Sequence, residues 1–194
     1  PELRPICDLS GAVVSPVDGT ISRIGDIQQQ AILQAKKHYY TLSQLLVEHR
    51  LADLFTNGNF ITLYLAPKDY HRIHMPVAGQ LEEMIYVPGK LFSVNPCTVD
   101  KEEGLFARNE RVIMLFKTEL GCMALVAVGA LIVGSIAARW HGIVKASGRK
   151  EIARWQYSSQ AISFAKGEEL GHFQLGSTVI LLFQNGAVGW DKAL

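Results

Sequence analysis

Ser177 follows Gly176 directly and precedes an apolar run, Val179–Phe183. Its hydroxyl becomes a nucleophile wherever a neighbouring base can take its proton. Glycine leaves its own carbonyl open to approach and tolerates the strained backbone angles that an attack within the chain requires. The Gly176–Ser177 bond is therefore a candidate for self-cleavage, in which the serine attacks the preceding carbonyl. A plain Gly-Ser turn before a strand is the competing interpretation.

Two imidazoles and a carboxylate lie close together within residues 67–76, at Asp69, His71 and His74. Histidine acts as a base near neutral pH, and a nearby carboxylate fixes its tautomer and supports the imidazolium. On a helical turn His71 and His74 are i, i+3 neighbours and would face one pocket. The same pair could instead serve in packing or bind zinc, although a third ligand at a characteristic spacing is absent.

Asp18 adds a second carboxylate, in a turn ahead of a predicted strand. Taken alone, Asp18 and the glycine after it also fit a plain turn. Serine, histidine and aspartate from separate segments are the components of a catalytic triad, which only the fold can bring together. Basic and aromatic residues also mix in 86–95 and 105–111, where they would either hold an anionic, lipid-like substrate or form ordinary loop edges.

The composition limits the class of protein. With 19 Lys and Arg against 18 Asp and Glu, the net charge of +1 gives no strong field for binding nucleic acid. The cysteines are few and far apart, so we expect buried structural thiols in a reducing compartment. They are Cys7, Cys97 and Cys122. Three histidines are isolated, and we interpret them as surface or packing residues: His49, His141 and His172.

Short runs rich in β-branched residues and bounded by turn residues dominate the chain, and they predict strands. These runs are 12–14, 19–24, 60–65, 80–87 and 111–116. Helical patterning is limited to 40–54, where leucines recur at three- and four-residue spacing and Thr41 or Ser43 could cap the helix. One short helical turn is expected at 69–74, before Met75-Pro76 stops it.

The longest apolar run, 120–138, carries no charge and has about the length that crosses a bilayer. Gly121, Gly129 and Gly134 interrupt it, with patches of β-branched residues between them. We interpret the run as two short buried strands with a glycine bend, rather than as a membrane span.

These features predict a mainly β (α+β) protein, with curved antiparallel sheets in a barrel- or sandwich-like core and one or two short helices. No low-complexity linker divides the chain, so we expect residues 1–194 to form a single domain. The chain starts at Pro1 without an initial Met or a signal peptide, and we expect it to be part of a longer protein.

Five motifs, taken in order, resemble those of the phosphatidylserine decarboxylases of the bacterial and mitochondrial type. They are SPVDG (15–19), PKDYHRIHMP (67–76), MIYVPGKLFSVN (84–95), LFARNERV (105–112) and LGSTVILLF (175–183). The resemblance covers almost the whole chain. It implies a membrane-associated proenzyme that cuts itself at the Gly-Ser bond of LGST, and a single catalytic domain. The new N-terminal serine would become a pyruvoyl group, so that the cofactor is a covalent pyruvate from Ser177 and no metal is required.

The resemblance also implies how this proenzyme matures. His74, oriented by Asp18 and with Asp69 as a second candidate partner, would take the proton from the Ser177 hydroxyl. The oxygen would then attack the Gly176 carbonyl. Cleavage between 176 and 177 would leave a β chain, 1–176, and an α chain, 177–194.

The implied reaction converts phosphatidylserine to phosphatidylethanolamine and CO₂. The pyruvoyl group at 177 would form a Schiff base with the substrate amine and act as the electron sink when CO₂ leaves. His71 would return a proton to the carbon that loses CO₂.

The substrate implied by the resemblance lies in a membrane. A peripheral protein on the cytoplasmic face of the inner or cell membrane is therefore expected, held by segments before Pro1 and by apolar loops around the site. The β and α chains would stay associated, a homodimer remains an option, and nucleic acid is not a partner.

Two other classes of protein fit parts of the sequence. One is a lipoyl-carrier or sugar-phosphotransfer module with a similar SPVDG-like turn, and the other is a metal-dependent hydrolase using His71 and His74.

Overall fold

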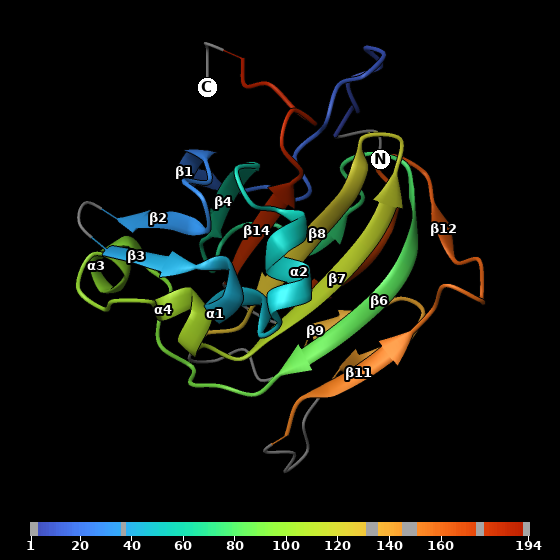
Figure 1. Ribbon diagram of the computed structural model, residues 1–194. Helices are drawn as coiled ribbons and strands as arrows, with labels where there is room; N and C mark the ends of the chain where they lie inside the picture. Colours follow the sequence, from blue (N-terminus) through green and yellow to red (C-terminus); the bar gives the residue numbers. More distant parts are fainter. Residues whose placement is uncertain (1–3, 36–37, 131–135, 145–150, 174–176, 192–194) are drawn as a thin grey trace.

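The computed structural model describes residues 4–35, 38–130, 136–144, 151–173 and 177–191. Within these ranges strands predominate, and the helices are short (Figure 1). The prediction of a mainly β protein with antiparallel sheets is confirmed.

The larger sheet contains eight antiparallel strands, in the order β1-β4-β14-β8-β7-β6-β11, and β12 also pairs with β6. Their bounds are β1 (Thr20–Asp26), β4 (Asn59–Leu65), β6 (Gly79–Val87), β7 (Arg111–Thr118), β8 (Gly121–Val128), β11 (Ala153–Gln156), β12 (Ser163–Phe164) and β14 (Ser177–Phe183). Among the described residues this sheet stays open between β1 and β11, so it does not close into a barrel.

A smaller sheet packs behind the larger one, and its four antiparallel strands follow the order β10-β9-β13-β5. The bounds are β5 (Arg72–His74), β9 (Ile136–Ala138), β10 (Gly142–Val144) and β13 (Glu169–Phe173). A separate two-stranded sheet pairs β2 (Ala31–Ala35) with β3 (His38–Thr41).

Four short helices are described: α1 (Leu42–Leu46), α2 (His49–Leu54), α3 (Pro96–Val99) and α4 (Leu105–Arg108). The prediction of one helix over 40–54 is wrong, because Val47 adopts the left-handed conformation at φ 57° and ends α1. Thr41 caps α1 as predicted, since its hydroxyl accepts the N–H of Gln44 and the Gln44 side chain accepts the N–H of Thr41.

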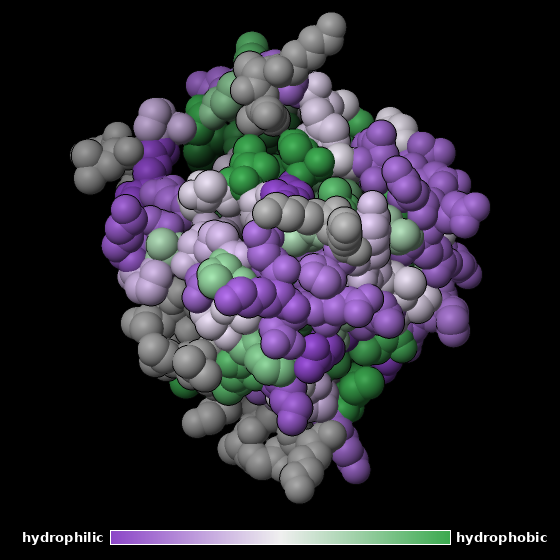
Figure 2. Space-filling view, turned by 90° about the vertical axis from the view of Figure 1, so that its left-hand side faces the viewer, coloured by the Kyte–Doolittle hydropathy of each residue, from purple (hydrophilic) through white to green (hydrophobic). Residues whose placement is uncertain are grey.

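The large sheet is buried on both faces. One face packs against the small sheet through residues such as Leu65, Val179 and Leu181, together with Ile73 and Phe173. The opposite face packs against α1, α2, α4 and the β2–β3 pair, which lie in front of it in Figure 1. From the side of β2 and β3 the surface is mostly hydrophilic, with hydrophobic patches towards its upper and lower edges (Figure 2).

Strand β14 lies in the interior of the large sheet. It lies between β4 and β8, and all seven of its residues are buried. Burial on two faces explains why its sequence reads as a continuous apolar run rather than an alternating one. Full burial of each large apolar side chain here stabilises the fold by about 2 kcal/mol.

Four of the five predicted strands form, as β1, β4, β6 and β7. The strand expected at 12–14 is absent from the described structure, where Val14 makes one backbone hydrogen bond, to Pro76. The described part of the 120–138 run forms β8 and β9, which confirms the interpretation as strands. No helix in the described ranges is long and apolar enough to cross a membrane.

The cysteines differ from the expectation of buried thiols. Cys7 and Cys97 are exposed, and only Cys122 is partly buried. Burial raises the pKa of the Cys122 thiol to about 11.

Candidate active site

Ser177 is the first residue of β14, and it is completely buried. Its Oγ has no hydrogen-bond partner among the described residues. Because side chains alternate along a strand, Ser177 shares the face of Val179 and Leu181, which packs on the small sheet. A buried hydroxyl without a partner is costly in a merely structural role. Gly176, the other half of the predicted scissile bond, lies outside the described residues.

His71 lies just before β5, beside the end of β13. The N–H of Phe173 donates to the His71 carbonyl at 3.0 Å, so the β5–β13 ladder continues to His71. By strand alternation His71 is on the same face as Ile73, which is buried in the core between the two sheets. Both ring nitrogens of His71 are buried and lack a hydrogen-bond partner within the described structure. Its imidazole is therefore free to bind or protonate a group entering the site.

The expectation that His71 and His74 lie on one helical turn is wrong. Residues 72–74 are the extended strand β5, which pairs with β13. On a strand, residues three apart point to opposite faces, so the two imidazoles do not share the single face that was predicted.

His74 is held by both of its ring nitrogens. Its Nδ1 lies 2.9 Å from the carbonyl oxygen of Gly167, and its Nε2 lies 3.2 Å from the hydroxyl of Tyr70. The Tyr70 and His74 rings also stack, with centroids 5.8 Å apart and an angle of 19° between the planes. Tyr70 was not singled out in the sequence, although its i, i+4 spacing to His74 inside the PKDYHRIHMP motif was visible.

Asp69 shapes the loop that leaves β4. Its carboxylate accepts the N–H of Ala66 at 2.7 Å, and its own N–H donates to the Ala66 carbonyl at 2.9 Å. Leu65, the residue before this turn, lies directly opposite Ser177 in the β4–β14 pair. Asp69 therefore fixes the chain next to Ser177, as turn-forming aspartates do.

Asp18 lies close to the same end of β4. A Cβ on Gly19 would come within 2.5 Å of the Tyr64 carbonyl oxygen, so only glycine lets this turn approach β4 so closely. The Asp18 carboxylate, 48% exposed, is bound by Nε of Arg4 at 2.7 Å. Within the described structure, neither Asp18 nor Asp69 makes a hydrogen bond to His74.

The basic and aromatic segments at 86–95 and 105–111 contain residues that stabilise the scaffold. The Arg111 guanidinium is buried and donates to the carbonyls of Gln44, Leu45, Ala107 and Asn109 at 2.7–2.9 Å. Burial lowers the pKa of Arg111 to about 10, so the guanidinium remains charged at neutral pH.

Asn109 is also buried in this part of the scaffold. It accepts the N–H of Phe92 and donates to the carbonyls of Phe92 and Gly129. These contacts favour the interpretation as loop edges over lipid binding for Asn109 and Arg111.

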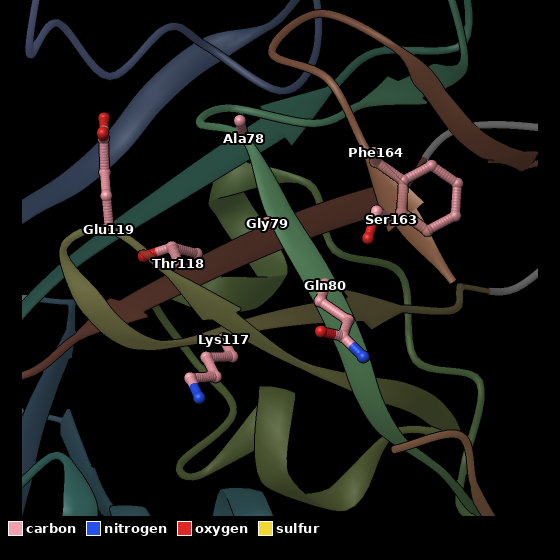
Figure 3. A pocket seen from close by; sticks show the side chains of 8 residues that line it. All are labelled: Ala78, Gly79, Gln80, Lys117, Thr118, Glu119, Ser163 and Phe164. Carbon is pink, nitrogen blue, oxygen red and sulfur yellow. The ribbon is translucent and has the colours of Figure 1, made fainter. Parts of the chain in front are cut away.

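An open hollow of about 450 Å³ lies at the far end of β6 and β7 from Arg111. In Figure 3 the polar ends of Gln80, Lys117 and Glu119 point in different directions and do not converge on a common centre. The described residues include no group of three or more His, Cys, Asp or Glu placed to hold a metal ion.

Fold and site together define a β-sandwich protein with a buried serine at the head of its central strand and two histidines on and just before a short strand of the second sheet. The sequence model of the family Phosphatidylserine decarboxylase matches residues 1–193. The chain belongs to the phosphatidylserine decarboxylase family, which confirms the resemblance and favours it over the carrier-module and metal-hydrolase alternatives.

Similar curated proteins come from several bacteria. A phosphatidylserine decarboxylase proenzyme of Coxiella burnetii is 52% identical over 98% of this chain and 67% of its own length. One of Acidovorax ebreus is 53% identical over 100% of this chain and 69% of its length. One of Shewanella frigidimarina is 51% identical over 97% of this chain and 67% of its length.

Proposed function

We propose that this protein is a self-processing decarboxylase that converts phosphatidylserine to phosphatidylethanolamine and CO₂. Family membership and the similar proenzymes support this activity. The structural observation that carries the proposal is the Oγ of Ser177, which is buried without a hydrogen-bond partner in the described structure at the head of β14.

In maturation, Ser177 Oγ attacks the Gly176 carbonyl while a histidine takes its proton. The peptide C–N bond breaks as the ester C–O bond forms. β-Elimination of the ester releases the β chain, 1–176, with a C-terminal carboxylate and leaves dehydroalanine at 177. Tautomerisation to the imine and hydrolysis then release ammonia and leave an α chain, 177–194, that begins with pyruvoyl. His74 is the proposed base of this step, and its anchored imidazole supports that role.

The burial of Oγ, which has no partner among the described residues, makes position 177 suitable for a group that must be shielded from water. A pyruvoyl group at 177 would supply an electrophilic carbonyl for the substrate amine and an electron sink for the loss of CO₂. His71 is the proposed donor of the proton that replaces CO₂. Its buried ring nitrogens, unpartnered in the described structure beside the end of β13, support this role.

One observation favours a different assignment of catalytic roles to His71 and His74. His71 is on the strand face that points into the core between the sheets, as Ser177 does, whereas His74 is three residues further along β5. In this alternative His71 takes the Ser177 proton as well. Single substitutions of the two histidines separate the alternatives.

The two cleavage products should remain one folded unit. The α chain would carry β14, whose seven residues pair with β4 and of which residues 178–183 pair with β8, both in the β chain. Removing this central strand would expose the core on both faces of the large sheet. We further propose peripheral attachment to the membrane that contains the substrate.

The activity is tested by following CO₂ release from phosphatidylserine in detergent micelles. The wild-type protein should release CO₂, and Ser177→Ala should not. Ser158→Ala, at an exposed serine away from the site, is the matched control and should retain activity. Full activity of Ser177→Ala would overturn the proposal.

A further inference from the structure

The end of the large sheet that carries Ser177 can be followed from strand to strand. Thr178, the residue after Ser177, pairs with Val128 at the end of β8. Val128 pairs with Arg111 at the start of β7, and Arg111 pairs with Val87 at the end of β6. A row of paired residues thus crosses four strands beside Ser177, and we call this end of the large sheet the site end.

Ile152 lies at the site end, directly before β11. Ala153, the first residue of β11, pairs with Tyr86, one position before the end of β6. The end of β6 and the start of β11 lie side by side at the lower edge of the sheet in Figure 1. Four strand spacings separate β11 from β14, so Ile152 is about 20 Å from the head of β14 along the site end. Ile152 is 45% exposed.

Ile143 lies at the corresponding end of the small sheet. The next residue, Val144, ends β10 and pairs with Ile136, which in turn pairs with Phe173. Phe173 ends β13 and precedes Ser177 by four residues, so this end of the small sheet leads directly to the site end. Ile143 is 61% exposed.

A ring contact holds β10 of the small sheet beside β11 of the large one. The rings of His141, just before β10, and Trp155, on β11, have centroids 4.5 Å apart. From this contact β10 runs towards Ile143, and β11 can be followed back to Ile152. The two exposed isoleucines therefore lie near one another at the same end of the molecule, on elements of different sheets.

Two exposed lysines also lie at the site end. Lys68 follows the end of β4, where Leu65 pairs with Ser177. Lys90 follows the end of β6, and its carbonyl accepts the N–H of Glu110, directly before β7. Cations and apolar side chains thus occur together at the end of the fold that carries the buried serine.

The charges near the site end favour an anionic partner. Glu169 pairs with Arg72, and the Asp69 carboxylate accepts a backbone N–H within its own turn. Glu151 is exposed beside Ile152, but the six residues before it in the sequence include three Lys or Arg and no acid.

We propose that the site end is the surface by which this protein docks on a bilayer that contains anionic phospholipid. Ile143 and Ile152 enter the boundary between headgroups and acyl chains, and the ammonium groups of Lys68 and Lys90 lie at the phosphates. The inference rests on the proposed function, in which a bilayer lipid must reach position 177. Docking through the site end turns the head of β14 towards that lipid.

Vesicle binding tests the apolar half of this surface. The chain carries Ser177→Ala, so that sedimentation with mixed phosphatidylcholine and phosphatidylserine vesicles measures binding without turnover. Ile143→Ser and Ile152→Ser should each weaken binding about tenfold, because each removes an apolar side chain that leaves water on docking. Leu54→Ser, at a leucine 39% exposed on α2, is the matched control and should bind like the parent chain. Helix α2 precedes the start of β4, at the opposite end of the sheet from position 177.

The lysines provide an independent arm. Lys68→Gln and Lys90→Gln should each weaken binding to the mixed vesicles about fivefold, and neither should change binding to vesicles of phosphatidylcholine alone. Lys117→Gln, at an exposed lysine near the other end of β7, is the control and should bind both kinds of vesicle like the parent chain.

Two results would overturn the inference. One is vesicle binding that is unchanged in both isoleucine variants, or reduced equally in Leu54→Ser. The other is a change of oligomeric state in the isoleucine variants without loss of vesicle binding, which would assign this surface to a second copy of the chain.

CO₂ release separates this inference from the proposed function. In the otherwise wild-type chain, Ile143→Ser and Ile152→Ser should slow release from phosphatidylserine in vesicles but not from monomeric short-chain phosphatidylserine, which needs no docking. Equal slowing with both substrates would overturn the inference. A wild-type chain that binds vesicles but releases no CO₂ from either substrate would overturn the proposed function alone.

Discussion

The backbone N–H of Phe173 donates to the carbonyl of His71, and this hydrogen bond places the histidine beside the end of β13. The chain then leads from Phe173 to Ser177, the first residue of the central strand β14. A non-local strand pairing therefore places His71 beside Phe173, four residues before Ser177 in the chain, although His71 and Ser177 are far apart in sequence.

Single substitutions should separate the role of His71 in decarboxylation from that of His74 in cleavage. His71→Ala should still cleave but lose decarboxylation by about 100-fold, and His74→Ala should slow cleavage by a similar factor, since general acid–base catalysis typically contributes at least this much. Cleavage is measured by intact mass and turnover by CO₂ release. His172→Ala, at an exposed position on β13, is the control. Loss of cleavage in His71→Ala with normal cleavage in His74→Ala would reverse the assignment.

Arg111 should be a major contributor to stability. Arg111→Met removes a charged donor and leaves buried carbonyls without a partner, which should lower the free energy of unfolding by about 3 kcal/mol. Urea denaturation of intact chains, in a Ser177→Ala background, measures the loss. Arg108→Met removes exposed interactions, namely an ion pair with Glu102, a hydrogen bond to the Glu103 carbonyl and a cation–π contact with Phe92, and should cost about 1 kcal/mol. Equal losses of unfolding free energy in both variants would show that Arg111 contributes no more to stability than an exposed arginine does.

His141 should make the fold sensitive to acid. Burial lowers its pKa below the ordinary 6.5, so the folded state favours the neutral ring and the unfolded state binds the proton more readily. Stability from this group is complete above pH 6.5 and declines as the pH falls below it. His141→Asn should therefore lose less thermal stability between pH 7.5 and 5 than the parent chain does. His49→Asn is the control and should lose as much thermal stability as the parent chain. An equally large loss in His141→Asn would contradict the prediction.

The sequence predicted the central strand well because its signal is local. The run 179–183 is long, apolar and preceded by a Gly-Ser pair, and it forms β14 with Ser177 at its head. The strands β1, β4, β6 and β7 were found for the same reason. Thr41 was found as a cap because capping involves residues only a few positions apart.

The predictions that were wrong concern segments whose conformation depends on contacts with distant parts of the chain. The i, i+3 spacing of His71 and His74 suggested a helical turn, but pairing with β13 holds residues 72–74 extended. The predicted helix from residue 40 starts two residues later, because residues 38–41 pair with β2. Likewise, no spacing in the sequence shows that Asp18 meets Arg4, or that Arg4 lies on Tyr70.

Self-cleavage between Gly176 and Ser177 can be read from the intact mass of the purified wild-type chain under denaturing conditions. Two fragments are expected: residues 1–176, and the 18-residue segment 177–194 with its N-terminus blocked as pyruvoyl. Ser177→Ala should give a single uncut chain. A folded wild-type protein that remains one intact chain, or one that is cut at another bond, would contradict self-cleavage at Gly176–Ser177.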